Sequence, residues 1–283
     1  MTFQAALLAF FPCLILAQSN LNDVPQILEV PRLSEGPAAP GKRVIMTTAG
    51  WEGTEVHHTM YLPTDWKPGQ KQPVIVEYAG NGGYKNKLGD VSEGTVEGCV
   101  MGYGLSGGTG FLWISLPFVE MNGTSKRNAV KWWGDVEETK RYCVATVRDV
   151  CDRFGGDAAR VVLMGFSRGA IACNYIGLHD DEMASLWLGM ICHSHYEGEF
   201  KHPAPDNNAW PERLKRLRQP QFISQELSTQ KTQDVIVSTG VKGDFTFAAL
   251  PFANHSARWT LCDMPLRAQA REWLLQLVSS VKP

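Results

Sequence analysis

Short apolar runs alternate along the chain with longer segments in which apolar residues recur at helical spacing. The runs are rich in β-branched and aromatic residues, which favour strands, whereas the spacing of the longer segments is typical of amphipathic helices. The predicted strands span residues 44–47, 55–62, 73–78, 111–116, 160–166, 187–192, 221–224 and 245–250. Helices are predicted at residues 135–154, after Ser167, and at residues 232–238 and 265–281. This alternation predicts an α/β protein with a mostly parallel sheet covered on both faces.

The segment at residues 135–154 shows the helical pattern most clearly. Tyr142, Val147 and Val150 fall on one face at helical spacing. Asp135 stands where a side-chain oxygen would cap the first turn, and the pair of glycines that begins at Gly155 would end the helix.

One strand-to-helix junction carries a candidate nucleophile. The strand at residues 160–166 leads into Gly165-Phe166-Ser167-Arg168-Gly169, and helix-forming residues follow. This order is the one that a nucleophile elbow requires. The tight turn would hold the serine in strained backbone angles, and the glycines would leave room for the crossing chain. We therefore predict that Ser167 is a nucleophile.

A second segment matches the same Gly-x-Ser-x-Gly pattern. It runs from Gly104 to Gly108 around Ser106, but glycines interrupt the residues before it and no helical pattern follows. Since the pattern has meaning only between a strand and a helix, we predict a loop at Ser106 and no catalytic role.

A serine nucleophile needs a base within hydrogen-bond reach. His255 follows the last predicted strand and precedes the closing helix, which is where the base would stand. His193 and His195, at the end of an earlier strand, could instead line the pocket. We predict that His255 is the base.

The base in turn needs a carboxylate that fixes its tautomer. Glu226 lies at the end of the penultimate predicted strand, in the chain order serine, acid, histidine. Glu197, after the neighbouring strand, is the alternative, and Asp234 is a weaker third candidate. Glu226 is our first choice.

The tetrahedral oxyanion needs two backbone N–H donors. One is expected from Arg168, directly after the nucleophile. The other is expected from the glycine-rich turn at residues 79–83, with Asn81 as first choice and Gly82 as second. The Arg168 side chain could reach the substrate or pair with a carboxylate.

Two adjacent tryptophans, Trp132 and Trp133, precede the helix at residues 135–154. On a loop they would form an aromatic wall for a sugar or phenolic group and bind substrate. Packing in the core is the more ordinary interpretation, since large aromatic side chains are mostly buried.

Composition narrows the class of protein. The chain has 283 residues, of which 44% are hydrophobic and 20% are charged, and its net charge is −2. This suits one large globular domain and gives no indication of a nucleic-acid partner. No spacing of cysteines and histidines resembles a zinc site, so we expect no metal.

The N-terminus differs from the rest of the chain. Residues 5–17 form an uncharged apolar run that is too short to span a bilayer and is followed by polar residues. We predict a signal peptide at residues 1–19, with cleavage after Ser19 or Ala17, a secreted or periplasmic protein, and no membrane span in the mature form. No Lys or Arg precedes the run, so a buried helix or an uncleaved anchor is the alternative.

The remainder of the chain is predicted to divide into two parts. Residues 20–41, rich in Pro, Gly and Ala, suggest a linker, and residues 42–283 the catalytic domain, with a small cap near residues 197–220. Six cysteines remain after residue 19, an even number that permits disulfides in an exported chain. Burial as small hydrophobic side chains is the alternative.

The elbow around Ser167, the turn at residues 80–83 and the pair Asn254-His255 resemble those of the α/β-hydrolase superfamily. The resemblance extends from near Val44 to the closing helix. Within that superfamily the chain is similar to secreted bacterial serine esterases of the polyhydroxybutyrate-depolymerase or carbohydrate-esterase type. The resemblance implies an eight-stranded, mostly parallel sheet, a catalytic triad, a covalent acyl-enzyme and no cofactor. The chain departs from it at Ala79, where many relatives carry His, and in having Glu rather than Asp as the acid.

Together these observations predict an exported hydrolase of carboxylic esters, acting on a small-molecule or polymer-linked ester. A serine peptidase of the same fold and a catalytically inactive binding module are the alternatives. Turnover of amides would favour the peptidase, and a missing acid would favour the binding module.

Overall fold

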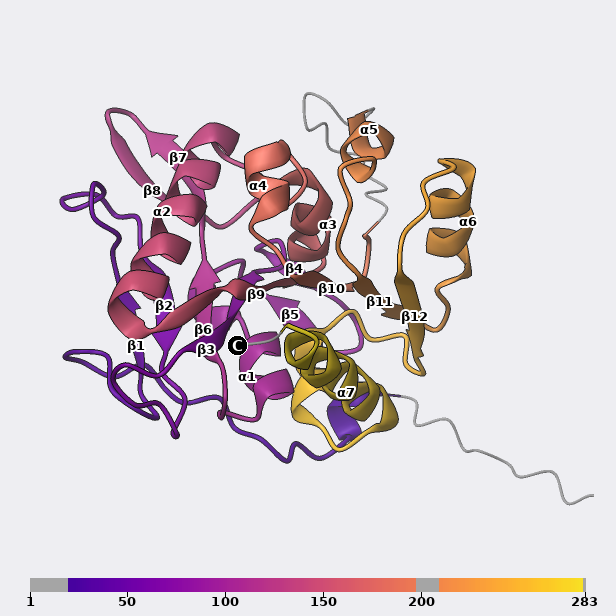
Figure 1. Ribbon diagram of the computed structural model, residues 1–283. Coiled ribbons are helices and arrows are strands. Elements are labelled where there is room, and N and C mark those ends of the chain that lie inside the picture. The colour runs from indigo at the N-terminus through magenta and orange to yellow at the C-terminus, as the bar shows by residue number, and fades with distance from the viewer. Residues whose placement is uncertain (1–19, 197–208, 282–283) are drawn as a thin grey trace, which may run out of the picture.

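A central sheet of eight strands runs through the protein, in the order β1-β2-β6-β3-β9-β10-β11-β12. The computed structural model describes residues 20–196 and 209–281 (Figure 1). The strands are β1 (Arg43–Met46), β2 (His58–Tyr61), β3 (Gln72–Tyr78), β6 (Leu112–Leu116), β9 (Gly156–Phe166), β10 (Gly189–His193), β11 (Gln221–Glu226) and β12 (Phe245–Leu250). β1 and β2 are antiparallel to their neighbours, and all pairings from β6 to β12 are parallel. The predicted mostly parallel α/β architecture is confirmed.

Helices cover both faces of this sheet. Figure 1 shows α1 and α7 on one face, and α2, α3 and α4 on the other. The helices are α1 (Met101–Ser106), α2 (Val136–Phe154), α3 (Arg168–Tyr175), α4 (Asp181–Ser185), α5 (Trp210–Leu214), α6 (Gln230–Ser238) and α7 (Pro265–Ser279). Short 3₁₀ turns are η1 (Leu21–Asp23), η2 (Val96–Gly98) and η4 (Ala257–Leu261).

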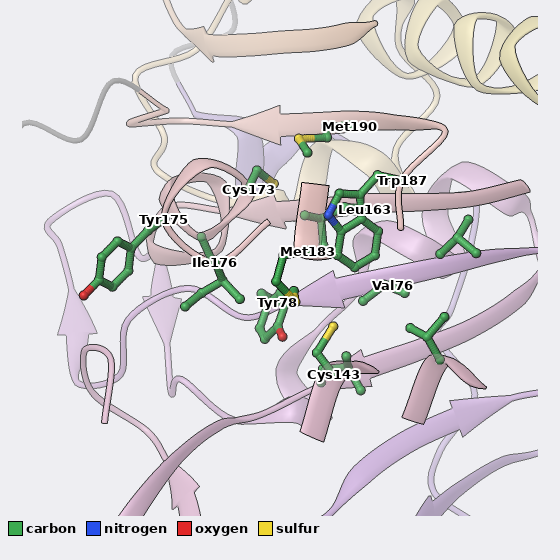
Figure 2. Packing of buried hydrophobic residues seen from close by; sticks show 14 of the residues in the cluster. Val76, Tyr78, Cys143, Leu163, Cys173, Tyr175, Ile176, Met183, Trp187 and Met190 are labelled. Atoms are coloured by element: carbon green, nitrogen blue, oxygen red, sulfur yellow. The ribbon is translucent and has the colours of Figure 1, made fainter. Parts of the chain in front are cut away.

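The side chains of each central strand alternate between two hydrophobic layers, because successive residues of a strand point to opposite faces. In β9, Val161 and Leu163 join the layer under α2 and α3, whereas Val162 and Met164 join the layer under α1 and α7. Figure 2 shows part of the first layer, where Leu163 lies near Trp187. Burial on both faces explains why these strands read as continuous apolar runs in the sequence.

The predicted ends of α2 are confirmed. The Asp135 side chain accepts a hydrogen bond of 2.9 Å from the Glu138 N–H, and Gly155 caps the C-terminus at a φ of 77°. Left-handed backbone of this kind is accessible to glycine without strain.

Several small elements were not predicted. Besides α4 and the 3₁₀ turns, they include α1, the hairpin of β7 (Phe118–Asn122) and β8 (Ser125–Ala129), and the pair β4 (Tyr84–Lys85) and β5 (Val91–Ser92). The loop predicted at Ser106 is wrong, since this residue ends α1. The glycines of α1 suggested a loop, yet they allow close packing, because a Cβ on Gly102 would lie 2.2 Å from Trp113 and one on Gly104 2.5 Å from Thr260.

The linker predicted at residues 20–41 is also wrong. Leu21 is fully buried, Gln26 forms a β-bridge with Cys262, and the Ile27 N–H donates to the Leu261 carbonyl at 2.9 Å. The Pro- and Gly-rich composition therefore marks an irregular segment that packs on the domain rather than a free connection.

Some predictions lie partly or wholly outside the described residues. These are the signal peptide at residues 1–19 and the first half of the cap, residues 197–208, including Glu197. The part of the cap that follows packs on the domain: Arg213 of α5 donates from Nε to the Asn174 Oδ1 of α3 at 2.9 Å.

Within residues 20–196 and 209–281, no helix is long and apolar enough to cross a membrane. All the cysteines of these ranges are free thiols and are buried, so none of them forms the disulfides that their even number permitted. They fill the core as small hydrophobic side chains. They are Cys99, Cys143, Cys151, Cys173, Cys192 and Cys262.

Candidate active site

Ser167 lies in the turn between β9 and α3, with φ 54° and ψ −115°. These angles are strained for a residue with a side chain, and they persist because the surroundings hold them. The Ser167 N–H donates to the His193 carbonyl at 2.9 Å. A Cβ on Gly169 would lie 2.0 Å from the Tyr78 carbonyl oxygen, and one on Gly165 would meet the Gly169 backbone. The turn therefore has the geometry of a nucleophile elbow.

His255 and Glu226 lie beside the serine in a continuous hydrogen-bonded chain. The Ser167 Oγ is 2.9 Å from His255 Nε2, and His255 Nδ1 is 2.8 Å from Glu226 Oε1. Because an ionised carboxylate only accepts hydrogen bonds, the proton belongs on Nδ1, which leaves Nε2 free to accept the serine hydroxyl. Ser167 lies in the turn between β9 and α3, His255 in the loop after β12, and Glu226 at the end of β11.

The environment of Glu226 favours its charged form. Burial raises the pKa of this carboxyl, but the hydrogen bond from His255 and the nearby His193 and His255 rings together outweigh burial, so that the pKa of Glu226 is lowered to about 2. Asp234, the third candidate acid, is instead an exposed residue of α6 whose Oδ1 accepts from Gln230.

A corner after β10 supports the acid. Ser194 and His195 both have left-handed backbone, with φ 69° and 61°. The buried Ser194 hydroxyl donates to Glu226 Oε2 at 2.9 Å and lies 3.0 Å from His255 Nδ1. Two strained residues in succession at this point indicate that the corner is held in place by its surroundings. No motif in the sequence indicated Ser194.

The three histidines near the elbow lie in different environments. The His195 ring is 4.9 Å from that of His255 and lines the cleft, as the sequence allowed. His193 is fully buried, and its Nδ1 shares a hydrogen bond with the Ser224 hydroxyl. Burial lowers the pKa of His193 to about 4, so this ring is neutral at neutral pH.

The two predicted oxyanion donors, Arg168 and Asn81, both line the cleft beside Ser167. Arg168 is the first residue of α3, where a backbone N–H has no acceptor within the helix. Gly82, our second choice, is unsuitable because its N–H donates to the Val130 carbonyl at 2.8 Å. The Asn81 side chain accepts from the Trp132 N–H at 2.8 Å, which fixes the turn.

The Arg168 side chain neither faces substrate nor pairs with a carboxylate. It is buried, and its guanidinium donates to the carbonyls of Gly94, Ala129 and Trp132 at 3.0, 3.2 and 2.9 Å. It also lies 4.2 Å from the centre of the Phe118 ring. Burial lowers the pKa of Arg168 to about 9. The fork of donors thus joins the loop at Gly94 to the end of β8 and the turn that follows it, a role that the sequence did not reveal.

The two tryptophans lie in different environments. Trp132, with a φ of 52°, lines the cleft, whereas Trp133 is 7% exposed and packs against Phe118 and Tyr175. The substrate-binding role predicted for Trp133 is therefore corrected to core packing, and Trp132 alone is placed for contact with a ligand.

The cleft over Ser167 has a volume of about 340 Å³. A neighbouring cavity of about 350 Å³ shares Ser92 with it and extends to Arg258. Across the described residues, no group of three or more His, Cys, Asp or Glu side chains is arranged to hold a metal ion.

Comparison with protein-family models and with curated proteins returns no match. Solved structures do match. S-formylglutathione hydrolase from Agrobacterium tumefaciens is 13% identical, with a TM-score of 0.60 over 88% of this chain and 99% of that one. Esterase 2 from Thermogutta terrifontis, solved after phosphorylation by paraoxon, is 13% identical, with a TM-score of 0.56 over 88% and 97%.

A larger protein matches as well. Dipeptidyl peptidase 4 from Porphyromonas gingivalis is 14% identical, with a TM-score of 0.50 over 85% of this chain. The match spans only 36% of that peptidase. The sheet order, the elbow and these structural similarities lead to one conclusion: the chain has the α/β-hydrolase fold.

Proposed function

We propose that this protein is a serine hydrolase that cleaves carboxylic esters through an acyl-enzyme. The observation that carries the proposal is the hydrogen-bonded chain from Ser167 through His255 to Glu226. A serine hydroxyl is a poor nucleophile at neutral pH, and a histidine with a fixed tautomer provides the base that it lacks.

In the first half of the reaction, Ser167 Oγ attacks the ester carbonyl while His255 Nε2 takes the hydroxyl proton. The carbonyl oxygen becomes an oxyanion that accepts from the N–H groups of Arg168 and Asn81. The carbon–oxygen bond to the alcohol then breaks, and His255 gives its proton to the leaving oxygen. The products are a free alcohol and an acyl group on Ser167.

In the second half, water attacks the acyl carbonyl and His255 takes one of its protons. The collapse of the second oxyanion breaks the bond to Ser167 Oγ, which recovers the proton from His255. Glu226 stays ionised throughout and stabilises the imidazolium. The low pKa of Glu226, about 2, supports this role.

The substrate is proposed to be a small or polymer-linked ester with a ring near the scissile bond. Trp132 offers an aromatic surface in the cleft, and Tyr84 and His195 lie next to the His255 ring. Rings of sugars and phenols stack well on such surfaces.

The test is a reaction of the purified protein with a fluorophosphonate probe, read by intact mass and peptide mapping. We expect one adduct, located on Ser167. An unlabelled protein with an intact fold would contradict the proposal and favour a binding module.

A matched pair of substrates separates an esterase from a peptidase. An aryl ester and the corresponding anilide, with the same acyl group, would be compared by kcat/KM. We expect turnover of the ester only. Efficient hydrolysis of the anilide would replace esterase with peptidase as the proposed activity.

Export is a separate proposal that rests on the apolar run at residues 5–17. N-terminal sequencing of the protein from its native host would show a start after Ser19 or Ala17. A start at Met1 would contradict export by this signal.

A further inference from the structure

The segment at residues 20–24, here called the N-terminal strap, contacts both the turn between β4 and β5 and the 3₁₀ turn η4 that follows the loop of His255. On one side, Asn20 Nδ2 and Asn22 Nδ2 donate to the Leu88 carbonyl at 3.0 and 2.9 Å. On the other side, the Val24 carbonyl accepts from the Arg258 guanidinium at 2.9 Å. In Figure 1 the strap is the indigo turn η1 beside the yellow C-terminal region, and η1 contacts η4.

The strap is bonded directly to Asn254, the residue before the candidate base. The Asn254 side chain accepts from the Leu21 N–H at 2.7 Å and donates to Asn20 Oδ1 at 2.9 Å. Asn254 and Leu21 are both fully buried. The side-chain nitrogen and oxygen of Asn254 therefore both form hydrogen bonds with residues more than 230 positions away in the chain.

A buried carboxylate completes this arrangement. Asp90, 3% exposed, accepts from Asn254 Nδ2 at 2.8 Å through Oδ1. Through Oδ2 it accepts from the His255 backbone N–H at 2.9 Å and from Asn86 Nδ2 at 2.8 Å. The partners shown for this carboxylate are neutral N–H groups. An amide at this position would place a donor against one of those donors, so the chemistry of the site calls for a carboxylate.

We infer that the N-terminal strap, Asn254 and Asp90 form a positioning network that holds the His255 backbone where its ring can reach Ser167. The inference rests on the proposed function. Neither Asp90 nor the strap lines the cleft over Ser167. They therefore act through His255 rather than on the substrate.

The physical reason lies in the loop itself. His255 follows β12 and precedes η4, so regular secondary structure does not fix its backbone. A displacement of the base by about 1 Å costs on the order of 100-fold in rate, because the proton must pass along a short hydrogen bond. The hydrogen bonds to Asp90 and to the strap supply the restraint that the loop lacks.

The test compares variants that loosen this network with a matched control. Asp90→Asn keeps the shape of the side chain but adds a donor, and Asn20→Ala removes one of the two hydrogen bonds between the strap and Asn254, the one to Asn20 Oδ1. Asp180→Asn is the control, since Asp180 also accepts a backbone N–H, that of Met183 at 2.9 Å, but caps α4 instead.

We expect the second-order rate of phosphonylation and kcat to fall about tenfold for Asp90→Asn and about threefold for Asn20→Ala, with KM within about twofold of wild type. Hydrogen exchange in residues 252–256 should rise in both variants and stay unchanged in Asp180→Asn. This local exchange is a readout that general loss of stability would not reproduce, and melting temperatures identify any such loss.

Wild-type rates and wild-type exchange in both variants would overturn the inference. A wild-type protein that takes no label would instead contradict the proposed function. In that case the exchange measurement still tests whether the strap restrains the histidine loop, so the two failures are distinguishable.

Discussion

Two segments of this protein share the pattern Gly-x-Ser-x-Gly, yet they form different structures. Around Ser167 the last glycine allows α3 to cross close to the Tyr78 carbonyl at the end of β3. Around Ser106 the first glycine allows α1 to pack against Thr260 of η4. In both places glycine permits a close approach, but only the first lies between a strand and a helix.

The two serine hydroxyls differ as much as their backbones. Ser167 is half-buried and bonds to His255. Ser106 is 1% exposed, and its hydroxyl bonds within its own turn, to the Tyr103 carbonyl and the Gly108 N–H. A motif of five residues therefore specifies a close approach of backbones, and the surrounding elements decide whether a nucleophile results.

Removal of each hydroxyl is the strongest test of this comparison. Ser167→Ala should lower kcat for an ester by about 10⁵-fold, because no acyl-enzyme forms, whereas Ser106→Ala should leave it within about twofold. Steady-state kinetics with both variants at matched folded concentration gives the answer. Equal losses in both variants would remove the distinction between the segments.

Replacement of the acid would make the Ser167 hydroxyl less reactive and so more like that of Ser106. Glu226→Gln keeps the size of the side chain but removes the charge that stabilises the imidazolium, and we expect kcat to fall about 10³- to 10⁴-fold. The KM should change little. An activity within tenfold of wild type would show that another group supports His255.

Substitution of the last glycine in each segment should give a smaller difference between the two segments. In Gly169→Ala the new Cβ would lie 2.0 Å from the Tyr78 carbonyl oxygen, which belongs to a central strand and cannot move away. In Gly108→Ala it would lie 2.9 Å from the Tyr103 ring, which can shift, although the φ of 78° adds strain.

We therefore expect Gly169→Ala to lower the free energy of unfolding by at least about 3 kcal/mol and Gly108→Ala by about 1–2 kcal/mol. Urea unfolding of both variants measures the difference. Of the two, only Gly169→Ala should also reduce kcat of the folded protein, because it displaces the elbow. The reverse order of stability would contradict the packing argument.

The smallest expected effect is a pH dependence of the free energy of unfolding that comes from His193, the buried residue bonded to the elbow. The pKa of His193 is about 4 in the folded protein and about 6.5 in an unfolded chain. Between these values the unfolded state binds the proton and the folded state does not, so stability is lost as the pH falls from about 6.5 towards 4.

His193→Gln should make the free energy of unfolding less dependent on pH in that window, by up to about 1.4 kcal/mol per pH unit. Denaturant titrations of wild type and variant at pH 7 and pH 5 give the comparison. His58, whose pKa burial lowers to about 3, titrates in both proteins and cancels in the difference. Parallel pH profiles would show that His193 is charged when folded.

The sequence predicted the elements that local chemistry governs. The main strands and the long helices appeared at the predicted places, because their side chains repeat with the period of the element and face an apolar layer. The elbow at Ser167 was predicted for the same reason, since strand, glycine turn and helix are contiguous.

Elements whose stability comes from distant partners were missed. The glycines of α1 suggested a loop, and packing against Trp113 and Thr260 overrides their low helix propensity. The composition of residues 20–41 suggested a linker, and only the burial of Leu21 and its bond to Asn254 show otherwise.

By itself, the sequence determined the α/β class, the elbow around Ser167 and the choice of His255 and Glu226 as its candidate partners. The tertiary structure decided what surrounds them: the Arg168 side chain donates to three backbone carbonyls, Ser194 bonds to the acid, and the strap bonds to the histidine loop. The reason is physical. Periodicity and turn chemistry act over a few residues, whereas these hydrogen bonds join groups 32 to 233 positions apart and exist only once the chain has folded.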